Sequence, residues 1–82
     1  MKLSIVVEDR LVVIDGLGFG KLTLIGVPKY THALQWNDGN GWIEYSDGRL
    51  NESITALPQW ATAACAVHKA AVKLAAETPT GI

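Results

Sequence analysis

The sequence predicts an α+β fold in which a small, twisted antiparallel sheet of four or five strands packs against one C-terminal helix. Three observations support this prediction. The first half of the chain contains short runs of apolar and β-branched residues separated by turn signals, as strands do. Residues 59–77 contain neither glycine nor proline and are rich in alanine, as a helix would be. With 82 residues the chain has room for one hydrophobic core, so residues 1–82 are expected to form a single domain.

Three strands are expected in the first part of the chain. They lie at about residues 4–7, 11–14 and 22–25. The polar Glu8, Asp9 and Arg10 separate two apolar, β-branched runs and therefore predict a hairpin. Residues 15–20 are interpreted as a glycine-rich turn, and Pro28 ends the third run.

A second hairpin is expected in the middle of the chain, where the turn sequence NDGN separates two strands. These strands lie at about residues 32–36 and 41–45. A type I′ turn centred on Asp38-Gly39 would pair Trp36 with Gly41, Gln35 with Trp42, Leu34 with Ile43 and His32 with Tyr45. A rival turn centred on Asn40-Gly41 would place an acidic side chain opposite an apolar one. The first register is therefore preferred.

One helix is expected at about residues 58–77. Pro58 suits its first turn, because the fixed φ of proline is helical and its missing N–H would have no partner there. Apolar residues recur along one side of this run. They are Leu57, Trp60, Ala61, Ala64, Ala71 and Ala75, and His68 lies on the same side. Because most of them are alanine, the helix can lie close against the sheet, with Trp60 as an anchor near its start.

Charge and composition argue against several classes of protein. The formal net charge is −1 and the basic residues are scattered, so neither nucleic acid nor a membrane surface is expected as a partner. The apolar share of 49% indicates a folded chain and could also supply the interface of a homo-oligomer. Cys65 is the only cysteine, so no internal disulfide is expected. The first apolar run is too short for a signal peptide or a membrane span, which favours the cytoplasm.

The segment WNDGNGWIEYSD agrees in part with the calcium loop of an EF-hand. Asp38, Asn40 and Gly41 would occupy its third, fifth and sixth positions. The first ligand position, however, holds Trp36 where the motif needs a carboxylate, and the last holds Asp47 in place of glutamate. An EF-hand also needs flanking helices, whereas strands are expected here. A hairpin turn explains the same residues, and no metal site is predicted.

The other motifs that carry chemistry are also incomplete. In the stretch DGLGFGKL, Asp15 and Leu22 stand where a phosphate-binding loop needs glycine and Ser or Thr. Neither His32 nor His68 has a cysteine or an acid at a recognised metal-ligand spacing. His68 is expected to be a hydrogen-bonded core histidine. The sequence therefore predicts no catalytic residue, no cofactor and no metal, and the chain is expected not to be an enzyme.

The tryptophans favour a contact surface. In the preferred register Trp36 and Trp42 lie on opposite faces of the hairpin, so one helix cannot cover both. One of them is therefore expected to meet a protein partner, as large amphipathic side chains often do. The alternative is that Trp42 lies across Gln35 of the neighbouring strand. The candidate contact residues are Trp36, Trp42, Tyr45 and Glu44.

The string H-A-L-Q-W…G-W-I-E-Y-x-D-G-R-x-N-E-x-I-T-x-L-P, residues 32–58, resembles a group of short uncharacterised proteins. These proteins are encoded among the tail and tail-fibre genes of tailed bacteriophages and of prophages of proteobacteria. VVEDRLVVIDG (6–16) and GVPKYTHALQW (26–36) are similar to the same group, so the resemblance covers roughly residues 5–60. The residues that carry it are His32, Gln35, Trp36, Trp42, Glu44, Asp47, Gly48, Asn51 and Glu52.

The resemblance implies a role in the virion tail or in its assembly, and it implies no reaction. The leading functional prediction is a non-enzymatic accessory component or assembly factor of the tail region, acting through protein contacts. Its place would be the cytoplasm of a bacterial host or the virion itself. A second prediction is a small binding module for a host protein or nucleic acid, and the balanced charge weakens its nucleic-acid version. A third, a hydrolase or metal enzyme, would need titratable groups that converge in a pocket.

Overall fold

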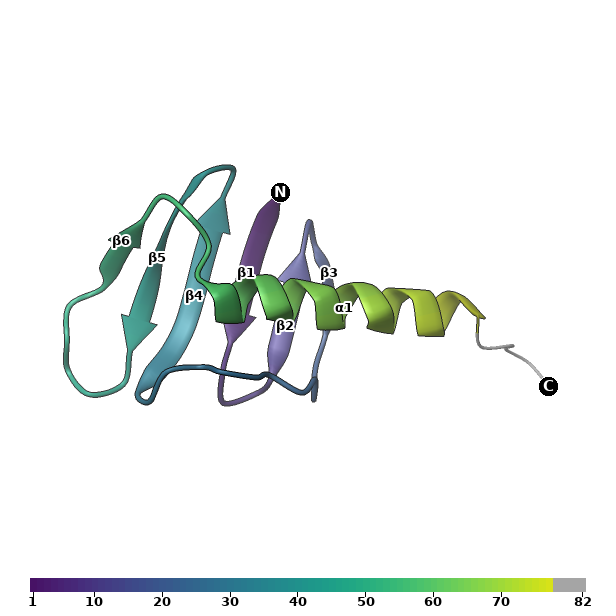
Figure 1. Ribbon diagram of the computed structural model, residues 1–82, viewed down its shortest axis with the longest axis horizontal. Coiled ribbons are helices and arrows are strands. Elements are labelled where there is room, and N and C mark those ends of the chain that lie inside the picture. Colours follow the sequence, from purple (N-terminus) through teal and green to yellow (C-terminus); the bar gives the residue numbers. More distant parts are fainter. Residues whose placement is uncertain (78–82) are drawn as a thin grey trace.

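The computed structural model describes residues 1–77 of the chain, which form a six-stranded antiparallel sheet with one helix on one face (Figure 1). The elements are β1 (Lys2–Val6), β2 (Leu11–Ile14), β3 (Leu17–Phe19), β4 (Thr31–Asn37), β5 (Asn40–Tyr45), β6 (Glu52–Ile54) and α1 (Gln59–Glu77). The strand order is β3-β2-β1-β4-β5-β6, so two three-stranded meanders meet at the central β1–β4 pair. The α+β class is as predicted, and the sheet has six strands instead of four or five.

The first meander differs from the prediction at the glycine-rich segment. Asp15 and Gly16 have φ values of 49° and 86°, which makes them a tight turn that pairs Ile14 with Leu17. The segment interpreted as a turn therefore contains β3. The prediction of a strand at residues 22–25 is wrong, because the chain has already turned back at this point and continues as an irregular connection to β4.

That connection, residues 20–30, runs from the β3 edge back to the middle of the sheet (Figure 1). Its apolar side chains Leu22, Leu24 and Val27 pack against the hydrophobic core. The apolar residues that suggested a strand are thus partly buried, and they are buried without pairing in the sheet. Alternating apolar residues alone do not distinguish a strand paired in the sheet from an irregular segment that packs against the core.

The β4–β5 hairpin has the predicted turn. Asp38 and Gly39 have φ values of 45° and 97°, as a type I′ turn requires. Trp36 lies opposite Gly41, Gln35 opposite Trp42 and Leu34 opposite Ile43, as predicted. The fourth predicted pair is wrong, because Tyr45 lies opposite Thr31 and not opposite His32. A β-bulge between Thr31 and Ala33 adds one residue to β4 and shifts the register there.

The hydrophobic core lies between α1 and the facing side of the sheet. Its strand residues come from the centre of the sheet and are at most 6% exposed; they are Leu3, Ile5, Val12, Leu34 and Ile43. The helix contributes Trp60, Ala61 and Ala64, which are 7%, 0% and 1% exposed. Small alanine side chains allow α1 to approach the sheet closely, and Trp60 fills space at its N-terminal end, as the sequence predicts.

The helix runs across the strands and ends beyond the sheet edge. Nε2 of His68 lies 2.7 Å from the carbonyl oxygen of Leu17. The His68 ring also packs edge-on against Phe19, with 5.3 Å between the ring centroids. These contacts place His68 above β3, the edge strand. The part of α1 that follows projects past this edge (Figure 1).

Candidate functional site

The sheet face opposite α1, called the open face below, is covered by no element of the described residues. It consists of the strand residues that alternate with the core residues. These are Ser4, Val6, Leu11, Val13, Ala33, Gln35, Trp42, Glu44 and Ser53. A solvated sheet face is usually polar, whereas this one carries several aliphatic side chains and a tryptophan. The open face is therefore the first place to look for a contact with another molecule.

Trp42 is the largest side chain on the open face and is 43% exposed. Its indole Nε1 donates a hydrogen bond of 2.9 Å to Oε2 of Glu44, two residues along the same strand. The polar edge of the ring is thus satisfied inside the protein, and the bond holds the ring in place. An exposed aromatic ring that is already oriented loses little conformational entropy when it binds.

The four predicted contact residues divide between the two faces of the sheet. Trp42 and Glu44 lie together on the open face, as their register requires. Trp36 and Tyr45 lie on the face that carries α1, where both are half-buried against the core. The register therefore brings Trp42 and Glu44 onto one face and Trp36 and Tyr45 onto the other, although Trp36 also lines a groove beside Trp42.

The aliphatic part of the open face was missed by the sequence interpretation. Val6, Leu11 and Val13 lie there, on the neighbouring strands β1 and β2, and all three are half-buried. A signal for them exists in the sequence. Residues 5–7 and 11–14 are continuous apolar runs, which are typical of strands that are covered on both faces.

Two shallow grooves flank Trp42. The β4 groove is lined by Lys2, Ser4, Gln35, Asn37, Asn40 and Trp42 together with Leu3 and Trp36. The β6 groove, on the other side, is lined by Asn37, Asn40, Gly41, Trp42, Ser53, Ile54 and Thr55. Lys2 is the only charged residue in either lining. In the sequence Asn37 and Asn40 flank the Asp38-Gly39 turn, and no sequence pattern places them at a surface site.

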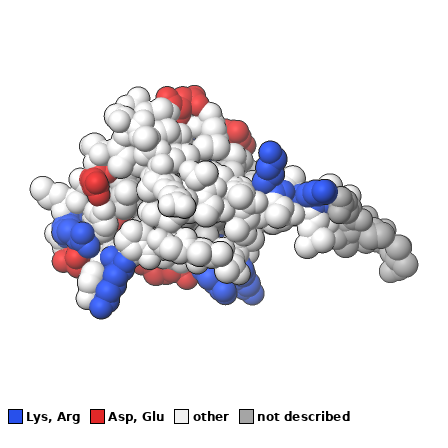
Figure 2. Space-filling view, in the orientation of Figure 1, with Lys and Arg blue, Asp and Glu red and all other residues white. Residues whose placement is uncertain are grey.

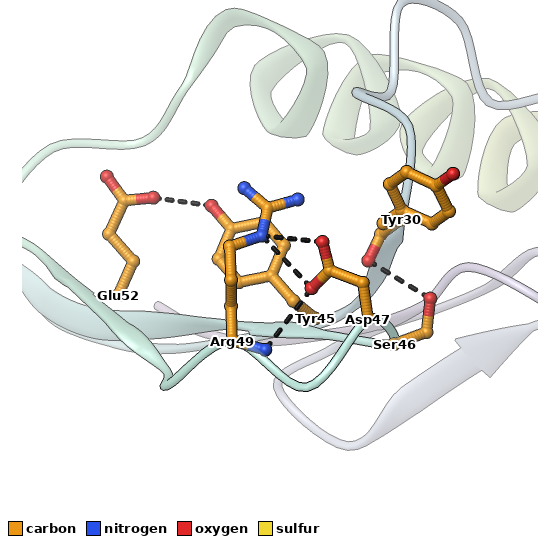
Figure 3. A network of polar contacts seen from close by, with 6 residues as sticks. All are labelled: Tyr30, Tyr45, Ser46, Asp47, Arg49 and Glu52. Atoms are coloured by element: carbon orange, nitrogen blue, oxygen red, sulfur yellow. Dashed lines mark hydrogen bonds and ion pairs between the residues drawn. The ribbon is translucent and has the colours of Figure 1, made fainter.

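A polar cluster lies at the other end of β5 and fixes the loop to β6 (Figure 3). Arg49 donates through Nε to both carboxylate oxygens of Asp47, at 3.0 and 2.9 Å, and its guanidinium lies 4.1 Å from the centre of the Tyr45 ring. The hydroxyl of Tyr45 donates a hydrogen bond to Glu52, which raises the pKa of Tyr45. Gly48 turns the chain with a φ of 89°.

This cluster explains several of the residues on which the sequence resemblance depends. Asp47, Gly48 and Glu52 each have a structural task in the loop. The hydrogen bond from Arg49 lowers the pKa of Asp47, so this carboxylate is held in an ion pair and not poised to exchange protons near neutral pH. The ion pair between Asp47 and Arg49 therefore stabilises the loop.

His32 and Glu8 form a second polar contact, between β4 and the β1–β2 turn. Nδ1 of His32 lies 2.7 Å from Oε1 of Glu8. This hydrogen bond raises the pKa of His32 above its usual 6.5 and lowers the pKa of Glu8 below its usual 4.5. The histidine contribution to stability is therefore fully present below pH 6.5 and is lost as the pH rises through its folded-state pKa. The glutamate contribution is present above pH 4.5 and is lost as the pH falls through its lowered pKa.

We expect Glu8→Gln to bring the pKa of His32 back towards 6.5, because it removes the partner that favours the imidazolium. An NMR titration of the His32 ring protons measures this change. Glu44→Gln is the matched control, since Glu44 raises the same pKa only through space and to a lesser extent. An equal downward shift of the pKa in both variants would contradict the assignment of the hydrogen bond.

Two further features concern metal binding and the single cysteine. Among residues 1–77, no three His, Cys, Asp or Glu side chains lie close enough to hold a metal ion. Cys65 is half-buried on α1, and this burial raises the pKa of its thiol, which disfavours the reactive thiolate. No helix within residues 1–77 is long and apolar enough to cross a membrane.

Comparison with known proteins found no match: no family model fits the chain, and neither a curated protein nor a solved structure is significantly similar to it. The open face and the sequence resemblance of residues 5–60 are therefore the features that bear on function.

Proposed function

We propose that this protein is a non-enzymatic accessory component or assembly factor of the tail region of a tailed bacteriophage or prophage, and that it acts through protein contacts. The observation that carries the binding role is the open face, where Trp42 is exposed and oriented on β5 and the half-buried aliphatic side chains Val6, Leu11 and Val13 lie on β1 and β2. Exposed apolar patches with aromatic residues are typical of protein interfaces. The tail setting rests on the sequence resemblance of residues 5–60.

The charge distribution supports a protein partner over nucleic acid. The formal net charge is −1. On the face that carries α1, shown in Figure 2, basic side chains are spread around the rim and alternate with acidic ones. On the open face, Lys2 is the one charged residue that lines the grooves beside Trp42. A nucleic-acid surface would gather lysine and arginine into one patch. The second candidate function, a module that binds a host protein, would use the same open face.

We expect the tagged protein, expressed during phage production, to co-purify with a tail or tail-fibre protein. Mass spectrometry of purified particles then separates the two versions of the proposal, since a virion component is present in the particles and an assembly factor is absent from them. Co-purification of host proteins alone would favour the second candidate. Light scattering of the isolated protein shows whether the open face instead joins two copies of the chain. Absence of any tail protein from both experiments would contradict the proposal.

A further inference from the structure

The outer edge of β3 carries backbone groups that have no partner. β3 ends the strand order and pairs only with β2. Ile14 and Leu17 flank the two-residue turn and form a hydrogen-bonded pair, so the next pair, Val13 and Gly18, is not hydrogen-bonded. The N–H and C=O of Gly18 therefore point out of the sheet, and within residues 1–77 no further backbone bond reaches them. Unpaired groups of this kind are a template for another strand.

The helix extends over the place that such a strand would take. His68 lies above β3 through its contacts with Leu17 and Phe19. Residues 69–77, called the overhang below, continue α1 by about 13 Å beyond this point. The helix runs across the strands (Figure 1), and an added strand would lie about 4.8 Å from β3, so the overhang covers the position of a seventh strand. No strand or helix of residues 1–77 occupies that position.

The side of the overhang that faces this position is apolar. Its residues follow His68 by three, four and seven positions and so lie on the same side of α1 as His68. They are Ala71, Val72 and Ala75. Leu17 lies on the α1 side of β3, opposite Ile14, and is 50% exposed. An added strand could bury an apolar side chain against these residues at every second position.

The charges around the β3 edge favour an acidic strand. Lys69 and Lys73 are exposed on the overhang, and Lys21 is exposed two residues after β3. Figure 2 shows basic side chains beside the projecting end of α1. The acid that precedes β3, Asp15, already accepts a hydrogen bond from the backbone N–H of Lys2. Charge complementarity therefore points to a segment that carries acidic residues.

The β6 edge lacks this combination. Ser53 also directs its backbone groups out of the sheet, because its neighbour Trp42 exchanges hydrogen bonds with Gln35 on the other side. The helix, however, begins at Gln59 and runs away from β6 (Figure 1). A strand added to β6 would have no helix above it. The two edges thus differ in the apolar cover that they offer to a partner.

We propose that the β3 edge binds an extended, acidic segment of a partner protein, which pairs with β3 as a seventh strand beneath the overhang of α1. The segment places apolar side chains against the helix at every second residue. This site does not involve the open face, so the inference goes beyond the proposed function.

The test is an NMR titration of the ¹⁵N-labelled protein with the capped peptide Glu-Thr-Val-Thr-Val-Thr. We expect a downfield shift of the Gly18 amide proton as it gains a hydrogen bond, together with shifts of the Ala71 and Val72 amides. Gly18→Pro should abolish binding, because proline removes the outward N–H and its ring blocks the added strand. The fold tolerates proline on an edge where the N–H faces outward, and Gly18 does not have a positive φ. Ser53→Pro is the matched control at the β6 edge and should leave binding unchanged.

The overhang is tested separately. Ala75→Arg should weaken binding by about tenfold, because a large side chain then fills the space needed by the apolar residues of the peptide. Ala66→Arg is its control, since Ala66 is exposed on the opposite side of α1. The matched peptide Lys-Thr-Val-Thr-Val-Thr should bind more weakly than the acidic one. Amide dispersion in the same spectra shows that each variant is folded.

Absence of a Gly18 shift at millimolar peptide would overturn the inference. Undiminished binding by folded Gly18→Pro or Ala75→Arg would do the same, as would equal binding of the lysine peptide. If light scattering shows that the protein self-associates and that Gly18→Pro is monomeric, a second copy occupies this edge and the proposal of a partner segment fails. Co-purification of a tail protein tests the proposed function independently of all these results.

Discussion

Leu34→Ala is expected to destabilise the protein by about 3 kcal/mol or more. Leu34 is 0% exposed at the centre of the sheet, where it lies opposite Ile5 on β1 and Ile43 on β5. Its truncation removes apolar contacts on both sides and leaves a cavity beneath α1. A domain of this size has a total stability of about 4–12 kcal/mol, so the loss is a large share of the total. Urea denaturation followed by circular dichroism measures it.

Leu50→Ala is the control for this prediction. The same side chain is truncated, but Leu50 is 90% exposed in the β5–β6 loop, so a change within about 0.5 kcal/mol is expected. Similar losses of stability in both variants would contradict the position of Leu34 in the hydrophobic core.

Gly41→Ala is expected to destabilise the protein by about 2 kcal/mol, because there is no room for a side chain at this position. A Cβ on Gly41 would lie 2.2 Å from the backbone oxygen of Gln35 and 3.0 Å from the Cα of Trp36. Backbone atoms cannot rotate away as a flexible side chain could, so the β4–β5 pairing would have to shift. Thermal and urea unfolding of the variant provide the measurement.

Gly20→Ala provides the comparison. No atom lies within 4 Å of a Cβ at Gly20, and its φ is not in the left-handed region. Its replacement should leave stability unchanged or raise it by about 0.4–1 kcal/mol through the lower entropy of the unfolded chain. If Gly41→Ala were tolerated as well as Gly20→Ala, this result would contradict the close contact between β4 and β5 at Gly41.

The parts of the fold that local signals specify could be predicted from the sequence. Asp38-Gly39 determines a two-residue turn, and the turn then determines the register of three residue pairs. The helix was expected at about 58–77 and is observed at Gln59–Glu77, because a long run without glycine or proline is a strong and local signal. Asp15-Gly16 carries the same turn signal as Asp38-Gly39, so β3 could have been found by applying the same rule twice.

The remaining features depend on contacts between distant residues. β6 has three residues in a turn-rich stretch, and it becomes a strand because β5 offers it an edge to pair with. The bulge before Ala33 places Tyr45 opposite Thr31 instead of His32, and no local sequence pattern indicates it. Leu22 and Leu24 pack against the core from an irregular connection. Their place depends on the β1–β2–β3 meander, which directs the chain back across the sheet.

Part of the candidate site could likewise be predicted from local signals, and part depends on contacts between distant residues. The register placed Trp36 and Trp42 on opposite faces, and with one helix in the sequence this was sufficient to predict an uncovered tryptophan. The β4 groove beside Trp42 could not be predicted, because Lys2 and Ser4 line it from β1, which is far from β5 in the sequence. The Asp47 and Glu52 carboxylates, prominent in the resemblance, prove to hold a loop together.

The central claim is that the open face, and not the helix side, meets the partner. Photo-crosslinking tests it most directly, with a photoreactive amino acid placed at Gln35 on the open face or at Ala66, an exposed position on α1. In phage-producing cells we expect a crosslinked adduct with a tail protein from the Gln35 position and none from the Ala66 position. An adduct from Ala66 alone would contradict the account.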